Sequence, residues 1–485
     1  MSKNVLITLL VLLCVACLCL LSVLCLAGGV SYLFNIQSSS NNPVTPLPSA
    51  QLSTATPTPS FFPAITEAPT VSQAEPTSTL QTEDINAQMD EIEGQVSHLR
   101  GLQPLAAVDR QLISTDELRQ KVEQDFFKDY TQQDVQDDQR TLSAFGLLDP
   151  DFDLYDLYVN LYSEQVAGYY DSETKQMYVI QEEGFGGPER MTYAHEYTHV
   201  LQDQYYDLQN GLKLSTEDCQ ADSERCAAVT ALIEGDATLT EQYWLYTYGT
   251  DQDRQQLNDF YSTYKSPVYD SAPKFLQEDM LFPYSQGLDF VSNFFTSGGY
   301  SQVDEIYQNP PLSTEMILHP EKYPDDKPVS VTLPDLSSVL DRPLDKIEDG
   351  VLGEWYTYLV LAYGRDPATH LTDSQAKNAA AGWGGDAYTI YWDEQAGLPV
   401  LVLDTVWDTT GDANEFASAF NQYANGRWGD SASSKTDETI WSTASDGTVA
   451  FYVKGDETLW AMAPSLEDVN TIVDYLTVPV TIGRP

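Results

Sequence analysis

The chain has 485 residues, of which 24 are basic and 73 acidic, so its formal net charge is −49 at pH 7. A field of this sign repels nucleic acid and anionic membrane surfaces, and it argues against both as binding partners of the folded part. The aromatic content of 11%, with 30 tyrosines, indicates folded material, and the length allows two or three domains.

The N-terminus begins with an uncharged, mostly apolar run over residues 5–34, and Lys3 is the only charged side chain before Glu67. A run of this length can cross a bilayer of roughly 30 Å as a helix. With Lys3 on the cytoplasmic side, the rest of the chain would lie outside. We therefore expect residues 1–36 to be a transmembrane anchor or signal of a single-pass membrane protein with an extracytoplasmic C-terminal part. A cleaved signal peptide and a lipoprotein anchor are the alternatives.

Residues 37–82 are rich in serine, threonine and proline and contain too little apolar surface to fold, so they predict a disordered linker. Four of the six cysteines lie in the N-terminal apolar run. The other two, Cys219 and Cys226, are close in sequence. In an oxidising compartment we expect them to form a disulfide.

The first folded domain is expected over residues 83–330. It begins with a helical stripe that contains Ile92, Val96 and Leu99. Residues 166–180 form two β-rich runs around a polar turn, which predicts a hairpin. An edge strand of that hairpin could bind an extended peptide by strand addition, although an ordinary structural hairpin fits the pattern equally well.

The sequence Thr192–Leu201 contains the pattern H-E-x-x-H, formed by His195, Glu196 and His199. Pro188 and the glycines before it predict the start of a helix, and residues 210–211 predict its end. Residues four apart lie one above the other on a helix, so both imidazoles can reach one ion. With five histidines in the chain, chance would produce this pattern on the order of a few times in a thousand such sequences.

A second helix is expected from about residue 222 to 248, and Glu234 lies within an apolar stretch of it. A buried carboxylate is costly unless it is paired or binds a metal. We therefore predict one zinc ion bound by His195, His199 and Glu234, with a water as the fourth ligand. Glu196, beside the ligands, would be the general base that takes the proton of this water.

These motifs carry a resemblance that covers roughly residues 160–250. A hairpin, the H-E-x-x-H helix and a downstream helix with Glu234-Gly235-Asp236-Ala237 resemble the gluzincin metalloproteases, the thermolysin-like branch. They also resemble the peptidase-MA-like domains of bacterial envelope proteins. The resemblance implies a mainly helical zincin-type catalytic domain with a small sheet, which hydrolyses peptide bonds. The metzincin branch is excluded because Gln202 and Tyr205 occupy its glycine and histidine positions.

Thermolysin-like enzymes use a further histidine or tyrosine to stabilise the oxyanion, and the candidates here are His319, Tyr323 and Tyr169. Carboxylates commonly orient metal-bound histidines, and Asp203 and Asp236 are the candidates for that role.

A Pro- and Asp-rich connection over residues 323–345 predicts a boundary. Beyond it, residues 346–485 predict a C-terminal α+β module, so that the whole chain is α+β. Its expected elements are a helix at 346–364, strands near 387–392 and 399–406, a helix at 412–424, strands near 447–462 and a helix at 466–477.

The sequence thus predicts a membrane-tethered, extracytoplasmic zinc peptidase whose partner is a peptide or protein substrate. Two alternatives stay open at this stage. One is a non-catalytic envelope protein that uses a peptidase scaffold for binding or adhesion. The other is a zinc amidase that acts on cell-wall material.

Overall fold

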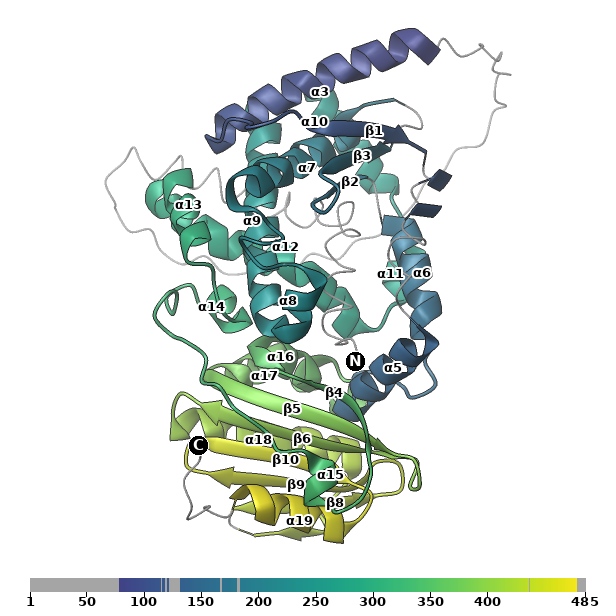
Figure 1. The fold of residues 1–485 in the computed structure, drawn as a ribbon, viewed down its shortest axis with the longest axis vertical. Helices are drawn as coiled ribbons and strands as arrows, with labels where there is room; N and C mark the ends of the chain where they lie inside the picture. Colours follow the sequence, from purple (N-terminus) through teal and green to yellow (C-terminus); the bar gives the residue numbers. More distant parts are fainter. Residues whose placement is uncertain are drawn as a thin grey trace, which may run out of the picture.

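The computed structural model describes residues 78–114, 116–117, 120–121, 131–165, 168–180, 184–435 and 437–477. The predicted anchor at 1–36 and most of the predicted linker at 37–82 lie outside these residues. Within the described part, no helix is both long and apolar enough to span a membrane. The described chain is a mixed α+β structure, with a mainly helical part and a larger sheet at its other end (Figure 1).

The helical part contains a small sheet in the order β1-β3-β2. Strands β2 and β3 form the predicted antiparallel hairpin, in which Tyr169 lies opposite Tyr178. Strand β1 runs parallel to β3. The elements of this part are α3 (Ser78–Arg100), β1 (Asp109–Ile113), α5 (Gln132–Phe145), α6 (Leu154–Gln165), β2 (Gly168–Asp171), β3 (Gln176–Ile180), α7 (Gly187–Tyr206), α8 (Thr216–Ala221), α9 (Ser223–Thr247), α10 (Asp251–Thr263), α11 (Pro267–Ser271), α12 (Lys274–Gly298), α13 (Tyr300–Gln308) and α14 (Thr314–Leu318). The short helix α15 (Leu336–Val339) lies against the sheet of the C-terminal part (Figure 1).

Helix α7 carries the H-E-x-x-H pattern, as predicted, and its ends follow from local chemistry. The Glu189 carboxylate accepts a hydrogen bond from the Gly186 N–H at 2.9 Å, and Pro188 lies in the first turn. The helix ends where Asp207 adopts a left-handed φ of 48°. Its apolar face packs against α3 and the small sheet, which buries Ile92 and Val96 with Val200, Leu201 and Met177. The predicted stripe on α3 therefore faces α7.

Helices α9 and α12 cross with their backbones in direct contact. A Cβ on Gly235 would lie 2.2 Å from the carbonyl carbon of Gly287, and a Cβ on Gly287 would lie 2.1 Å from the Ala231 oxygen. A Cβ at either position would force the backbones apart, so glycine favours this close crossing. The glycine that follows Glu234 thus has a packing role: it lets the two helices approach closely beside that carboxylate.

The C-terminal part is built on a seven-stranded antiparallel sheet in the order β4-β5-β6-β10-β9-β8-β7. Residues alternate between its two faces, as the period of a strand requires. In β6, Leu401 and Leu403 join the core under α18, whereas Val400 and Val402 join the core under α19. The elements are β4 (Asp345–Gly350), α16 (Gly353–Tyr363), a 3-10 turn (Pro367–Thr369), α17 (Asp373–Ala380), β5 (Trp383–Asp393), β6 (Leu398–Trp407), α18 (Thr410–Trp428), β7 (Ser433–Ser434), β8 (Glu438–Thr443), β9 (Gly447–Lys454), β10 (Glu457–Ala463) and α19 (Leu466–Thr477).

The predicted helix at 346–364 is wrong over residues 346–352. Residues up to Gly350 form β4, which pairs with β5 so that Gly350 lies opposite Tyr388. Pairing with a strand some 40 residues away in the sequence overrides the local helical pattern there. The helix itself begins at Gly353.

The two parts of the chain share one hydrophobic core. Phe145 of α5 packs edge-on against Tyr388 of β5 and Trp460 of β10, with ring centroids 5.3 and 5.8 Å apart. Phe282 of α12 packs on Trp355 of α16 at 4.6 Å. Helix α16 of the C-terminal part therefore supports α12, which in turn packs against the helix that carries Glu234.

Candidate metal centre

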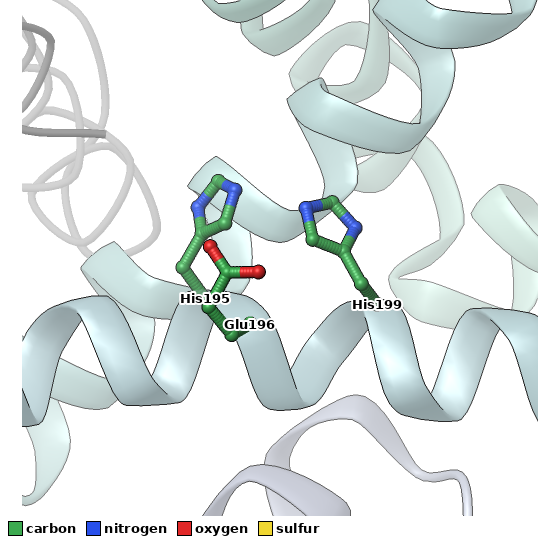
Figure 2. Close-up of side chains that lie close together, drawn as sticks. All are labelled: His195, Glu196 and His199. Atoms are coloured by element: carbon green, nitrogen blue, oxygen red, sulfur yellow. The ribbon is translucent and has the colours of Figure 1, made fainter. Parts of the chain in front are cut away.

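His195, Glu196 and His199 project from the same side of α7, with the carboxylate between the two rings (Figure 2). The ring centroids of the two histidines are 4.8 Å apart. One nitrogen of each ring and one oxygen of Glu196 all lie within 4.8 Å of one another. All three residues are buried, with exposed fractions of at most 8%. The predicted helical spacing therefore does bring these groups to one point.

Glu234 of α9 completes the arrangement from the facing helix. Its Oε2 lies 3.1 Å from Nε2 of His195 and 3.5 Å from Nε2 of His199. Ligands bound at 2.0–2.1 Å to a tetrahedral zinc ion are about 3.3 Å apart. The Glu234 oxygen thus lies near the spacing of zinc ligands from each of the two imidazole nitrogens, and the structure brings together the three residues that the sequence predicted as ligands.

The other nitrogen of each imidazole faces an oxygen. Nδ1 of His199 lies 2.8 Å from Oε1 of Gln202, and Nδ1 of His195 lies 3.2 Å from Oε2 of Glu241. Metal-bound histidines usually direct their second ring nitrogen to such an acceptor, because this fixes the tautomer that leaves Nε2 free to bind the ion. Sequence reasoning did not identify Gln202 or Glu241.

The electrostatics of the cluster show strong coupling. Burial alone would raise the pKa of Glu234, but the two imidazoles overcome this effect and lower it to about 2. Burial would lower the pKa of His195, yet the carboxylates of Glu234 and Glu241 raise it above its ordinary value. A negative carboxylate held between two imidazole nitrogens is a site that attracts a cation.

Glu196 is held differently from Glu234. Its Oε2 accepts a hydrogen bond from the backbone N–H of Tyr170 in β2 at 2.9 Å. Burial raises the pKa of Glu196 above its ordinary value, and the nearby Glu234 carboxylate raises it further. The two imidazoles and the Tyr170 amide lower this pKa, but the net shift is upward. A buried carboxyl with a raised pKa and one anchored oxygen suits proton transfer, and a dication beside it would lower that pKa again.

Asp203 ties the hairpin to α7. Its carboxylate accepts from the Tyr170 hydroxyl at 2.6 Å and pairs with Lys175 Nζ at 2.7 Å. Because Tyr170 also donates its amide to Glu196, Asp203 fixes the strand that holds the base. The sequence predicted that Asp203 orients a histidine, whereas these contacts link it to Glu196.

Asp236, the other predicted orienting carboxylate, reaches His199 through one intermediate. Its Oδ2 accepts from Gln202 Nε2 at 2.9 Å, and the other end of that amide faces His199. Arg100 Nε lies 2.9 Å from Oδ1 of Asp236. Asp236 therefore belongs to a buried polar chain that ends at the imidazole.

The three candidate oxyanion residues have other neighbours. His319 Nε2 lies 2.8 Å from Glu354 Oε1 of α16. Tyr323 donates its hydroxyl to the Asn309 carbonyl at 2.7 Å, and Tyr169 stacks on Tyr178. The aromatic side chain that the structure places beside the imidazole pair is Tyr284 of α12, whose ring centroid is 6.2 Å from that of His195.

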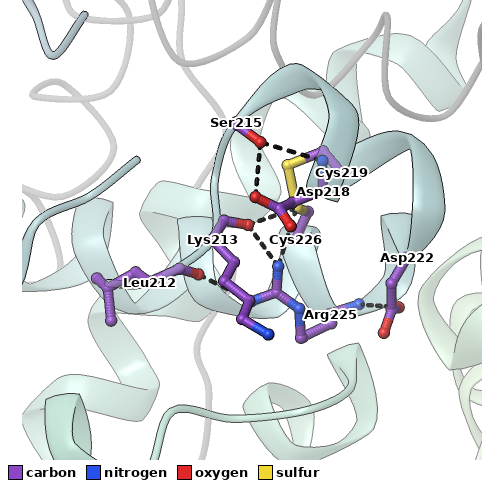
Figure 3. The surroundings of a disulfide bond; sticks show 8 residues. All are labelled: Leu212, Lys213, Ser215, Asp218, Cys219, Asp222, Arg225 and Cys226. Carbon is purple, nitrogen blue, oxygen red and sulfur yellow. Dashed lines mark hydrogen bonds between the residues drawn. A yellow bond between two sulfur atoms is a disulfide. The ribbon is translucent and has the colours of Figure 1, made fainter. Parts of the chain in front are cut away.

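The predicted disulfide between Cys219 and Cys226 is present and joins α8 to the first turn of α9 (Figure 3). Beside it, Arg225 donates to the carbonyl oxygens of Leu212 and Lys213. These contacts hold the segment after α7 against the start of α9. The helices that carry the histidines and Glu234 are thus joined near that end.

A second acidic cluster lies at the junction with the C-terminal part and contains Glu315, Asp326 and Asp408. Lys322 Nζ lies 2.6 Å from Asp408 and 3.3 Å from Asp326, and it also pairs with Glu315. A lysine side chain therefore supplies the cation for this cluster.

Comparisons with known proteins concern the C-terminal part of the chain. A family model described as a domain of unknown function (DUF8575) matches residues 342–473, which run from just before β4 into α19. The C-terminal module is similar to that family. No curated protein and no solved structure matches the chain. The matched range contains none of the clustered residues of the metal centre, so the interpretation of that centre depends on its geometry.

Proposed function

We propose that this protein is a membrane-tethered, extracytoplasmic zinc peptidase. The proposal depends on one observation. Oε2 of Glu234 lies 3.1 Å from Nε2 of His195 and 3.5 Å from Nε2 of His199. The Nδ1 atom of each ring faces an oxygen on its other side. If both imidazoles are neutral with hydrogen on Nδ1, three lone pairs point at one another. In the metal-free protein, protons on the ring nitrogens can bridge these atoms, as the raised pKa of His195 indicates, and we propose that a bound dication takes their place. The membrane tether is proposed from the apolar N-terminal run alone.

His195, His199 and Glu234 would hold the ion. A zinc ion in such a site lowers the pKa of a bound water toward neutrality and polarises the carbonyl of a bound amide. The remaining chemistry belongs to Glu196. With Oε2 anchored by the Tyr170 amide, its other oxygen can take the proton of the water and deliver it to the leaving amine.

Strand β2 would align the substrate. It lies at the edge of the small sheet, next to α7. The outward amide of Tyr170 is already bonded to Glu196. An extended peptide would therefore pair with the backbone groups of β2 on either side of that amide.

The test compares Glu196→Gln with the parent protein. The variant should bind zinc as the parent does, and its hydrolysis of a peptide library, followed by mass spectrometry, should fall by roughly 10²-fold to 10⁴-fold or more. Glu189→Gln is the matched control, because it lies on the same helix and glutamine also completes a capping box. Equal turnover by Glu196→Gln and the parent would refute the proposal.

A further inference from the structure

A chain of buried polar side chains connects α3, the first helix of the described residues, to the candidate metal centre. Arg100, the last residue of α3, Asp236 of α9 and Gln202 of α7 are each 0% exposed. Arg100 and Asp236 are 136 positions apart in the sequence, yet Arg100 Nε lies 2.9 Å from Oδ1 of Asp236. Burial of charged groups is costly unless they are paired, and Arg100 and Asp236 compensate each other's charge.

The orientation of the Gln202 amide follows from its neighbours. Its Nε2 lies 3.0 Å from the Ile233 carbonyl oxygen, 2.9 Å from Oδ2 of Asp236 and 2.9 Å from the Tyr307 hydroxyl. The first two atoms can only accept, and Tyr307 donates its own hydrogen to Asp236 at 2.8 Å. The amide nitrogen must therefore face this side.

The amide oxygen of Gln202 consequently faces His199, at 2.8 Å from Nδ1. An oxygen there requires hydrogen on Nδ1, because two acceptors would repel. The lone pair of His199 is then on Nε2, which points to Glu234. The tautomer of a predicted metal ligand is thus set by an amide whose own direction is set by Asp236.

Arg100 keeps Asp236 in place. Its guanidinium lies over the Tyr300 ring, 4.7 Å from the centroid, and its Nη1 is 2.7 Å from Oδ1 of Asp304. A carboxylate at 0% exposure without this cation would leave an uncompensated buried charge, which is strongly unfavourable.

We propose that Gln202 is the positioning residue for His199, and that Arg100 is a second positioning residue that acts through Asp236 and Gln202. This inference is built on the proposed function, because it concerns the affinity of the same site for zinc. It makes the end of α3 part of the proposed metal centre.

The first test replaces Gln202 by methionine, which keeps the volume and removes the amide. Zinc affinity is measured by competition with a chelator, and the cobalt(II)-substituted protein is compared by its absorption spectrum. The zinc dissociation constant of Gln202→Met should rise roughly tenfold to hundredfold, and the cobalt spectrum should shift. Gln204→Met, on the same helix but bonded to the loop at Ala106, should match the parent in both.

The second test uses Arg100→Lys. Lysine keeps the buried positive charge, so the protein should fold. It lacks the planar guanidinium that contacts Asp236 and Asp304 together. Its zinc dissociation constant should rise severalfold. Arg110→Lys is the matched control, because Arg110 pairs with Asp90 and Glu93 of α3 away from the centre. The double variant of Arg100 and Gln202 should bind zinc no more weakly than Gln202→Met alone, because both residues act along one path.

The outcomes separate the two proposals. A parent protein that takes up no zinc would overturn the proposed function, and the positioning roles with it. A parent that binds zinc, with Gln202→Met and Arg100→Lys binding it as tightly as their controls, would overturn the positioning roles alone. Fully additive losses in the double variant would overturn the claim that Arg100 acts through Gln202.

Discussion

We expect Glu224 to make the stability of this protein depend on pH. It lies in the first turn of α9, is 6% exposed, and accepts from the Thr314 amide at 2.6 Å and from the Thr314 hydroxyl at 2.7 Å. Gly353 of the C-terminal part packs against its other oxygen, where a Cβ would lie 2.1 Å away. Burial raises the pKa of Glu224 to about 8, and the charge of Asp386 contributes to this rise. The two hydrogen bonds from Thr314 lower the pKa but do not offset the effect of burial. We predict that Glu224→Gln flattens the pH dependence of unfolding.

The sign and size follow from the pKa values. The folded pKa of about 8 exceeds the ordinary value of 4.5, so the carboxyl favours the folded state fully below pH 4.5. That contribution is lost as the pH rises toward 8. The difference of 3.5 units corresponds to an upper limit of about 5 kcal/mol. Glu224→Gln should therefore match the parent near pH 4 and be more stable than it by roughly 2 to 5 kcal/mol above pH 8.

The assay is urea unfolding at a series of pH values, followed by circular dichroism, with a chelator present so that zinc release does not contribute. Glu217→Gln, at an exposed position in α8, is the control and should follow the parent curve. Parallel curves of unfolding free energy against pH for the parent and Glu224→Gln would refute the reasoning.

Two further predictions concern the surroundings of the metal centre. Asp203→Asn removes the anchor of β2 and should lower the turnover number roughly tenfold to hundredfold at unchanged zinc content, because the amide that holds Glu196 shifts; unchanged turnover would contradict the link to the base. Gly235→Ala forces a Cβ to within 2.2 Å of the backbone of α12 and should lower the unfolding free energy by about 1 to 3 kcal/mol or more. Gly94→Ala, in open space on α3, should raise it by up to about 1 kcal/mol, and equal stabilities of these two variants would contradict the close crossing.

Much of the centre could be predicted because it is local in sequence. His195 and His199 are one helical turn apart, and Glu234 was distinguished by its apolar surroundings. Glu241 lies seven residues after Glu234, on the same face of one helix, so helical spacing could have identified it. Gln202 is likewise one turn after His199.

Other features depend on contacts between distant parts of the chain. Arg100 meets Asp236 across 136 positions, and His319 meets Glu354 in the C-terminal part across 35. Neither partner could be inferred from spacing. Strand β4 was predicted as helix because its pairing with β5 is absent from any local pattern. Long-range pairing and burial determine these features.

X-ray absorption spectroscopy of the zinc-loaded protein tests the central claim most directly. The account predicts one zinc ion per chain with nitrogen and oxygen neighbours at about 2.0 to 2.1 Å, two of them imidazoles, and loss of an oxygen neighbour in Glu234→Ala. A protein that retains no stoichiometric zinc, or a coordination shell that Glu234→Ala leaves unchanged, would contradict it.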